Sequence, residues 1–193
     1  GRYVRIELPR RGTLTLAEVQ VFSNGRNVAP QGKGKQSRVC NDGGASRAID
    51  GRTDGSYGSG TQTHTRENDR NPWWELDLGA EHPIESVVVW NRTEGDLGLR
   101  LDRFTLSVQD GERREIFEKK GIAAPKPSTR VDISGGDPLA GIRLAAIRAA
   151  VATPKDQAGT FTALAALVKK GENVVPAAQG VRTLPRTSWP KEE

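Results

Sequence analysis

The histidine best placed to do chemistry lies in a polar loop that leads directly into a predicted strand. The stretch GSGTQTHTRENDRNPWWELDLG, residues 58–79, carries His64 among glycines and threonines, passes two adjacent tryptophans and ends in an alternating segment, residues 75–78. A histidine nitrogen in such a loop can bond a ligand hydroxyl, serve a catalytic group or simply lie at the surface. The residues around it decide between these roles.

No catalytic arrangement accompanies this histidine. Ser46, Asp50 and His64 are the residue types of a triad, but the sequence has no nucleophile-elbow spacing, no HExxH motif and no glycine-rich phosphate loop before a helix. A glycosidase would need two opposed carboxylates across a cleft, whereas Glu94 and Asp96 share one loop. We therefore predict that the chain is not an enzyme.

A change of parity marks a candidate metal site. In LTLAEVQVF, residues 14–22, the apolar residues have even numbers up to Leu16 and odd numbers from Val19. The alternation slips at positions 17 and 18, as a β-bulge would make it slip. Such a bulge turns a carbonyl and a carboxylate to the same side, which suits a hard cation. The alternative, that Glu18 simply faces solvent, stays open.

The first two thirds of the chain alternate with a period of two. Half-buried strands are predicted at RYVRIEL, WWELDLG, RFTLSVQD and TRVDIS, and a central strand, apolar on both faces, at IESVVVWN. Short strands with Gly, Pro and Asn turns predict a mainly β, antiparallel sandwich over residues 1–134. We expect residues 2–8 and 14–22 to pair inside the same sandwich as residues 73–109.

After SGGDP the period becomes helical, which places a boundary near residues 135 and 136. In DPLAGIRLAAIRAAVATP, Asp137 is the expected N-cap and Pro138 the first helical residue. A second helix is expected from TPKD, where Thr153, Pro154 and Asp156 resemble a capping box, as far as Gly171. This short α-helical tail, residues 137–193, either packs on the sandwich or is a HEAT-like stub, the first unit of a helical repeat.

Composition narrows the classes of partner. The 193 residues include 22 Gly and 11 Pro, which allows one substantial core and a small satellite. The net charge of +5 is spread over distant basic pairs interleaved with acids, so we predict no nucleic-acid partner. No apolar run is long enough to cross a bilayer, and Cys40 has no second cysteine to pair with.

Several motifs, in this order, resemble an F-type lectin (fucolectin) domain of the discoidin or galactose-binding-like jelly rolls. They are SRAIDGRTDGSY, THT, NPWWELDLG, VVVWNRTE and RLDRFTLSV, and the resemblance covers about residues 27–110. The N-terminal segment GRYVRIELPRRGTLTLAEVQVF is similar to the C-terminal end of the family. A circular permutation explains this order, because strands that come first can fill the slot left at the end of the sandwich. The rival explanation is that residues 1–23 complete an upstream domain.

The resemblance implies a fucose site made by a histidine and two arginines. The matching residues are His64, Arg92 and Arg100, with Glu94 where the family usually has Asp. A rigid guanidinium fork suits vicinal hydroxyls, and a nearby carboxylate keeps the fork oriented. The loop between the arginines is one residue longer than usual and lacks the frequent cysteine pair. Apolar packing against the sugar is therefore expected from Leu97 or Leu99.

The parity slip and the resemblance together predict a structural calcium ion. Its expected ligands are the carboxylates of Asp50 and Glu18, the side chain of Thr61, and backbone carbonyls. The residues that would supply the carbonyls are Arg47, Arg52 and Ala17. Such an ion would tie the AIDGRTDG loop to the N-terminal strand.

We therefore expect a carbohydrate-binding module for fucose or a related glycan sugar, in a larger secreted or periplasmic bacterial protein, with other domains of that protein as partners. Two alternatives stay open. One is a non-binding spacer or protein-interaction module, possibly of a protein with c-type haem or cupredoxin units. The other is an accessory domain of a hydrolase.

Overall fold

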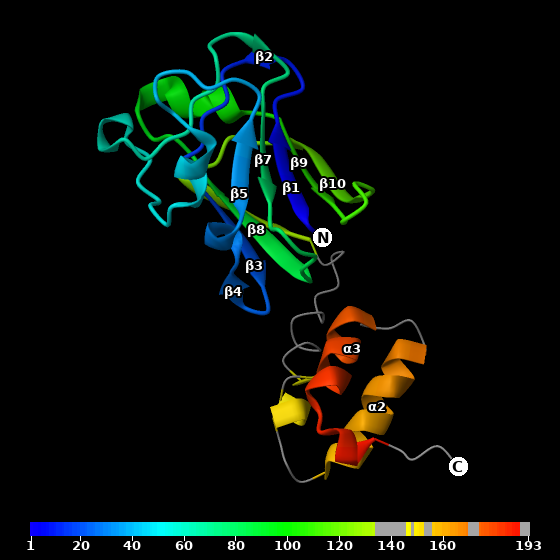
Figure 1. Cartoon of the computed structure of the whole chain (residues 1–193). Helices are drawn as coiled ribbons and strands as arrows, with labels where there is room; N and C mark the ends of the chain where they lie inside the picture. The colour runs from blue at the N-terminus through cyan, green and yellow to red at the C-terminus, as the bar shows by residue number, and fades with distance from the viewer. Residues whose placement is uncertain (134–145, 148, 153–155, 170–173, 190–193) are drawn as a thin grey trace. The chain divides into compact units, whose positions relative to one another are not determined.

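The period-two pattern forms antiparallel strands throughout the first part of the chain (Figure 1). The computed structural model describes residues 1–133, 146–147, 149–152, 156–169 and 174–189. The chain divides into two units, Gly1–Gly135 and Gly136–Glu193. No helix among the described residues is long and apolar enough to cross a membrane.

Two sheets and a small ribbon make up the first unit. The five-stranded sheet has the order β10 (Glu115–Ile122), β9 (Phe104–Gln109), β1 (Tyr3–Glu7), β7 (Trp73–Asp77) and β5 (Lys33–Gln36). The four-stranded sheet has the order β11 (Ser128–Asp132), β8 (Ile84–Trp90), β3 (Glu18–Ser23) and β4 (Arg26–Asn27). The ribbon pairs β2 (Arg11–Gly12) with β6 (Asp69–Arg70), and short 3₁₀ turns occupy the connections: η1 (Ala29–Gln31), η2 (Ala45–Ile49), η3 (Tyr57–Ser59) and η4 (Gly95–Leu101).

One core joins the inner faces of the two sheets. Alternate residues of the central strands are fully buried, as Val4 and Ile6 are in β1, and they pack in the same cluster as the inward residues of β3 and β8. The strand β8 is buried at Val87 and Val89 but half-exposed at Val88, so its outer face is not covered as the apolar run predicted. The predicted mainly β sandwich is confirmed.

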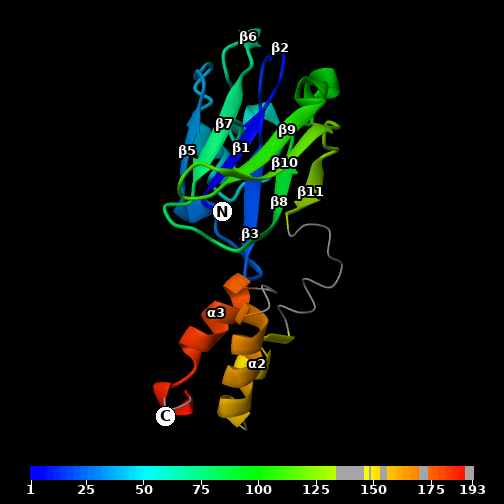
Figure 2. The ribbon, with the colours of Figure 1, turned by 90° about the vertical axis from the view of Figure 1, so that its right-hand side faces the viewer.

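The N-terminal strands belong to this sandwich. The strand β1 pairs with β7 on one side and β9 on the other, and Figure 2 shows it between them. The strand β3 pairs with β8 from Glu18↔Trp90 onward. The prediction that residues 2–8 and 14–22 pair inside the same sandwich as residues 73–109 is therefore confirmed, although Leu14 and Leu16 bond to Thr65 and Thr63. The rival explanation, in which residues 1–23 belong to another domain, is wrong. The circular permutation stays a prediction.

The predicted β-bulge at positions 17 and 18 agrees with the hydrogen bonds at the start of β3, because Glu18 pairs with Trp90 and the Ala17 amide also donates to the Trp90 carbonyl at 3.0 Å. The strand β3 begins at Glu18, and a further irregularity in its pairing with β8 lies between Phe22 and Ser23. Residues 14–17 are not part of that strand, although all are buried. The parity changes because the chain leaves one set of hydrogen-bond partners, residues 63–65, and joins another, strand β8.

The second unit contains α2 (Gln157–Lys169), α3 (Val174–Thr183) and η6 (Arg186–Ser188), with helical backbone also at residues 146–147 and 149–152. Asp156 accepts a hydrogen bond from the Gly159 amide at 2.8 Å, as a capping residue does. A small cluster joins the helices: Ile147, Leu164, Ala177 and Leu184. The predicted boundary near residues 135 and 136, and the predicted signals at Asp137, Pro138, Thr153, Pro154 and Gly171, lie outside the described residues. The HEAT-like assignment stays a prediction.

Because β1 is central in the sheet, truncating one of its buried side chains should markedly lower the free energy of unfolding. Ile6 is fully buried, so Ile6→Ala should lower the free energy of unfolding by about 3 kcal/mol through lost burial and a cavity. Ile116 on the outer strand β10 is 53% exposed, and Ile116→Ala should cost less than about 0.5 kcal/mol. Chemical denaturation of both variants measures the difference, and equal costs would contradict a central β1.

Candidate functional site

The loop that carries His64 is held against the N-terminal segment by two threonines. The hydroxyl oxygens of Thr63 and Thr65 accept hydrogen bonds from the amides of Leu16 (3.0 Å) and Leu14 (2.9 Å). The amides of the same threonines donate to the carbonyls of the same leucines. Because successive residues of an extended segment point to opposite sides, the His64 side chain points away from the threonine hydroxyls.

The contacts of His64 fix its tautomer. Its Nδ1 lies 2.7 Å from the Thr65 carbonyl oxygen, which can only accept, so Nδ1 carries the proton and Nε2 is an acceptor in the neutral ring. The side chain is buried, and this burial lowers the pKa of His64. The positive charges of Arg100 and Arg92 lower the pKa further, against the Thr65 carbonyl and Glu67, which raise it. The ring therefore favours its neutral form.

Arg92 is held rigidly beside this histidine. Its Nε donates to Glu94 Oε2 at 2.6 Å, and its guanidinium lies over the Tyr57 ring, 4.7 Å from the centroid. The Tyr57 ring in turn meets the His64 ring edge-on, with centroids 6.4 Å apart. Among the described residues, no hydrogen bond uses Nη1 or Nη2 of Arg92. Two rigidly aimed donor groups therefore remain available.

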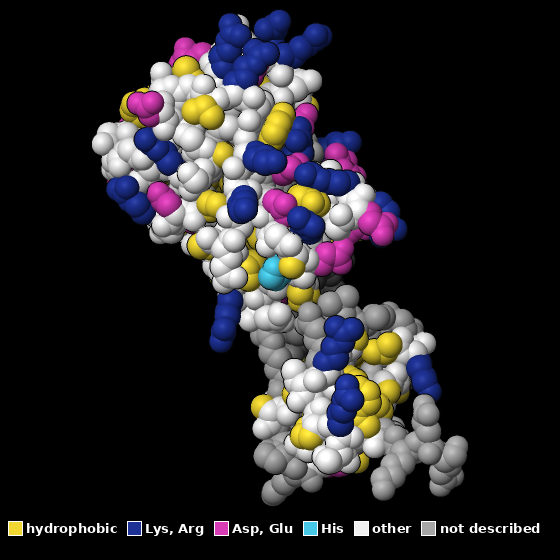
Figure 3. Space-filling model, in the orientation of Figure 1, with side chains coloured by type: hydrophobic (Ala, Val, Ile, Leu, Met, Phe, Trp, Pro, Cys, Tyr) yellow, Lys and Arg dark blue, Asp and Glu magenta, His cyan; other side chains and the backbone are white. Residues whose placement is uncertain are grey.

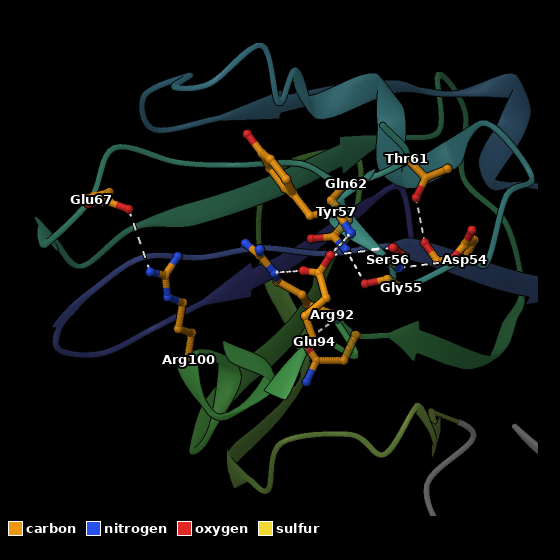
Figure 4. A network of polar contacts seen from close by, with 11 residues as sticks. Asp54, Gly55, Ser56, Tyr57, Thr61, Gln62, Glu67, Arg92, Glu94 and Arg100 are labelled. Carbon is orange, nitrogen blue, oxygen red and sulfur yellow. Dashed lines mark hydrogen bonds and ion pairs between the residues drawn. The ribbon is translucent and has the colours of Figure 1, made fainter. Parts of the chain in front are cut away.

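Glu94 holds the loops around Arg92 together. Besides Arg92, it accepts hydrogen bonds from the Tyr57 amide and from the Ser56 hydroxyl, the latter at 3.5 Å. Figure 4 shows this carboxylate between Arg92 and the loop of Ser56 and Tyr57. One acid thus orients the arginine fork and the aromatic ring below it, which is the supporting role expected from the sequence.

Arg100 approaches the same site from η4. Its Nη2 lies 3.6 Å from Glu67 Oε1, and its side chain is 28% exposed (Figure 4). Its positive charge is one of the causes that lower the pKa of His64. Leu97 and Leu99 lie on the same 3₁₀ turn, Leu97 half-buried and Leu99 52% exposed, so Leu99 offers apolar surface.

A buried amide shapes the turn that presents these residues. Asn91, almost fully buried, donates from Nδ2 to the Gly98 carbonyl (2.9 Å) and the Pro125 carbonyl (3.1 Å). Its Oδ1 accepts from the Arg92 amide at 2.8 Å. A Cβ at Gly98 would meet the Arg92 carbonyl oxygen at 2.7 Å, so only glycine allows the turn to pack this closely.

The comparisons with known proteins point to a family of sugar-binding domains. The family described as "NedA-like, galactose-binding domain" matches residues 47–136. Fucolectin-5 of Anguilla japonica is 35% identical over 117 residues, and Fucolectin-3 of the same organism is 41% identical over 117 residues. The chain spans 58% of the length of Fucolectin-5, and that match covers 58% of the chain.

Solved structures agree in both sequence and fold. A fucose-binding module of Streptococcus pneumoniae is 33% identical with a TM-score of 0.53, and the match covers 58% of this chain and 79% of that one. The lectin domain of lectinolysin, solved with Lewis B antigen, is 30% identical with a TM-score of 0.53, covering 55% and 76%. The chain belongs to the F-type lectins of the galactose-binding-like superfamily. The resemblance found in its motifs is therefore confirmed.

In this F-type lectin the two predicted carboxylate ligands lie close together. Glu18 is fully buried: its Oε1 accepts from the Gly51 amide at 3.2 Å, and its Oε2 has no hydrogen-bond partner. Burial raises the pKa of Glu18 to about 7, and the nearby negative charge of Asp50 adds to the effect. The expectation that Glu18 faces solvent is therefore wrong. Among the described residues no group of three or more His, Cys, Asp or Glu side chains forms a metal site, so a cation here would also need neutral oxygens.

The other predicted calcium ligands differ in their burial and in their contacts. Ala17 is buried beside Glu18, and Thr61 is buried with its hydroxyl donating to the Asp54 carbonyl at 2.5 Å. Arg52 turns its guanidinium to the Ser59 carbonyl at 3.2 Å, while its amide donates to Asp50 at 2.9 Å. Arg47 lies in η2, half-buried. No contact places its carbonyl at the Glu18 carboxylate.

Three residues of the site escaped the sequence argument. Tyr57 is an isolated aromatic in a glycine-rich loop, and Asn91 follows a strand, so neither falls in a periodic pattern. Gln62 is buried, with Nε2 donating to the Gly55 carbonyl and Oε1 without a partner. A polar residue in a threonine-rich run gives no signal of burial. For Asn91 alone a signal existed, the position of an amide directly before the predicted arginine.

The environment of His64 predicts its titration. In the folded protein its pKa should lie below the ordinary 6.5, so the stability it contributes is complete above pH 6.5 and is lost as the pH falls below that value. NMR titration of the imidazole in the variant His82→Gln, which leaves one histidine, measures this directly. Arg100→Gln should raise the value toward 6.5. A pKa above 6.5 would contradict the described contacts.

Proposed function

We propose that this F-type lectin domain binds glycans through the site around Arg92, with fucose or a related sugar as the anchoring residue. The observation that carries the proposal is the Arg92 guanidinium, held by Glu94 and Tyr57 with its Nη groups unpaired among the described residues. Fixed donors lose little entropy on binding, which suits a ligand that presents hydroxyl oxygens.

Each side chain has a distinct task in this proposal. Arg92 and Arg100 donate hydrogen bonds to sugar hydroxyl or ring oxygens. His64 accepts a hydrogen bond from a sugar hydroxyl at Nε2, because its Nδ1 is bonded to the Thr65 carbonyl. Leu99 supplies an exposed apolar surface for the carbon face of the ring. The solved relatives are a fucose-binding module and a lectin domain in complex with Lewis B antigen, which supports this assignment.

We further propose that the domain is non-catalytic and serves a larger extracytoplasmic protein as its glycan-targeting module. A single site of this kind binds weakly, so retention on a glycan surface would come from several copies. Should the site bind no sugar, the remaining explanation is a spacer or protein-interaction module.

Replacing the guanidinium of Arg92 by an ammonium group, which keeps the positive charge, tests the proposal. Wild type should bind L-fucose or a fucosylated oligosaccharide with a dissociation constant between about 1 μM and 1 mM. Arg92→Lys should weaken binding at least about tenfold, nearly as much as Arg92→Ala, because an ammonium cannot make the paired contacts. The matched control is Arg103→Lys on an 84% exposed side chain, which should bind as wild type does.

Titration calorimetry with L-fucose and with galactosides separates the outcomes. Absence of heat with every sugar at tens of millimolar would overturn the proposal in favour of the spacer. Binding that survives both Arg92→Ala and Arg100→Ala would place the sugar elsewhere.

We also propose that Glu18 and Asp50 hold a structural calcium ion, with carbonyl and hydroxyl oxygens completing its shell. The buried Glu18 Oε2 without a partner is the observation that fits a cation, because an unpaired buried carboxylate oxygen is costly. Ala17, which precedes Glu18, and Thr61 are both buried, and their oxygens are the neutral ligands we propose for this shell. The ion would supply charge neutralisation that no described side chain gives Glu18.

The effect of calcium on the melting temperature should therefore depend on pH. Without a cation, the raised pKa of Glu18 adds stability below about pH 4.5 that is lost as the pH rises through 7, a loss of up to about 3 kcal/mol. Added Ca²⁺ should raise the melting temperature markedly at pH 8 and little at pH 5. Glu18→Gln should abolish the effect, while Glu112→Gln, on an exposed side chain, should preserve it. An unchanged melting curve with Ca²⁺ at pH 8 would rule out the site.

A further inference from the structure

Four exposed arginines gather at one end of the sandwich, on and beside the β2–β6 ribbon. We call this the cationic tip: Arg10, Arg11, Arg66 and Arg70. In Figure 3 dark blue side chains crowd the end of the sandwich where Figure 1 labels β2. The net charge of the chain is thus unevenly distributed.

The acids near the cationic tip are already engaged with other arginines. Glu67 lies 3.6 Å from Arg100, and Asp69 lies 3.5 Å from Arg38. Among the described residues, no carboxylate lies within 4.0 Å of a guanidinium nitrogen of the four arginines of the tip. The tip therefore presents positive charge that the protein does not neutralise.

The pairing of the ribbon makes this charge costly. Arg11 and Arg70 are direct partners across the two strands, and like charges in that position repel at short range. Arg11 is also oriented, because its Nη1 donates to the Asn68 carbonyl at 3.4 Å. An anion bound at the ribbon would attract both guanidinium groups and so offset their mutual repulsion.

The cationic tip adjoins the proposed sugar site. Arg10 donates from Nη2 to the carbonyl oxygen of Arg100 at 3.1 Å, and its own carbonyl accepts from the Asn71 amide at 3.2 Å. A residue of the tip therefore touches the backbone of a residue expected to bind the sugar. A substituent or second sugar on that side of the ligand would meet arginines.

We infer that the ligand is an anionic glycan, in which a sulfate ester or a carboxylate next to the anchoring sugar is bound by the cationic tip. This inference rests on the proposed glycan-binding function. Arginine forks match the geometry of both anions and would make charge-assisted hydrogen bonds to them. A nucleic acid is less well suited, because the ribbon residues Arg11, Gly12, Asp69 and Arg70 offer no aromatic ring for a base to stack on.

Calorimetry with one fucosylated trisaccharide in neutral, sulfated and sialylated forms tests the inference. At about 50 mM NaCl an anionic form should bind wild type about tenfold more tightly than the neutral form, and salt at about 300 mM should reduce this advantage. The double variant Arg11→Gln/Arg70→Gln should lose the advantage but keep the neutral affinity. The control Lys119→Gln/Lys126→Gln, with the same loss of charge at exposed positions, should keep both.

The outcomes separate this inference from the function on which it rests. A gain for only the sulfated or only the sialylated form supports it and identifies the anion. Equal affinity for neutral and anionic forms overturns it and leaves the glycan site intact, whereas no binding of any form overturns both. Anionic binding that survives Arg92→Ala, or that heparin or single-stranded DNA matches in affinity, shows a general polyanion surface and overturns the inference.

Discussion

The hydrogen bonds between Thr63, Thr65 and the segment of Leu14 and Leu16 are the constraint on which the ligand site depends. They join a loop in the middle of the sequence to the first strands, and they use both hydroxyls and backbone groups. The direction of His64 follows from them, since its neighbours on both sides are fixed. The same segment delivers Glu18 at its end, so the histidine and the buried carboxylate are positioned by one set of contacts.

The end of the sandwich has two parts that differ in charge. Around Arg92 and His64 the charges are balanced, and at the cationic tip they are not. In the balanced part, Glu94 neutralises Arg92, and burial with positive neighbours keeps His64 neutral. The proposed sugar would meet oriented donors and one acceptor there, with the charge of Arg92 already paired with Glu94. In the unbalanced part, the nearby acids Glu67 and Asp69 pair with Arg100 and Arg38, so no described carboxylate pairs with the four arginines of the cationic tip. A neutral sugar and a charged substituent would thus meet two environments a short distance apart.

Most of the fold could be predicted from the sequence because burial and periodicity coincide. The alternation of β1 and β7 matches their buried faces, and the helical period expected through Phe161, Leu164 and Leu167 corresponds to α2. The slip in parity located the irregularity at Ala17 and Glu18, which both face Trp90, but it did not identify residues 63–65 as the partners of the segment before it. In the site, His64, Arg92 and Glu94 were found through motifs, whereas Tyr57 and Gln62 were not. Their roles depend on contacts between loops far apart in sequence, and the local pattern of polar and apolar residues cannot predict such contacts.

The placement of β1 couples folding to binding. This strand lies between β7 and β9, so the five-stranded sheet is not continuous until both ends of the sandwich sequence have come together. The chain then has to close long loops before its central contacts form, which is an entropic cost that the shared core has to offset. Leu14 and Leu16 are part of this core and their backbones also bind the loop of His64, so the contacts that order the site form on the same structure that completes the sheets. Glu94 therefore orients the Arg92 donors, and the Thr65 carbonyl orients the acceptor nitrogen of His64, without any contact from a ligand.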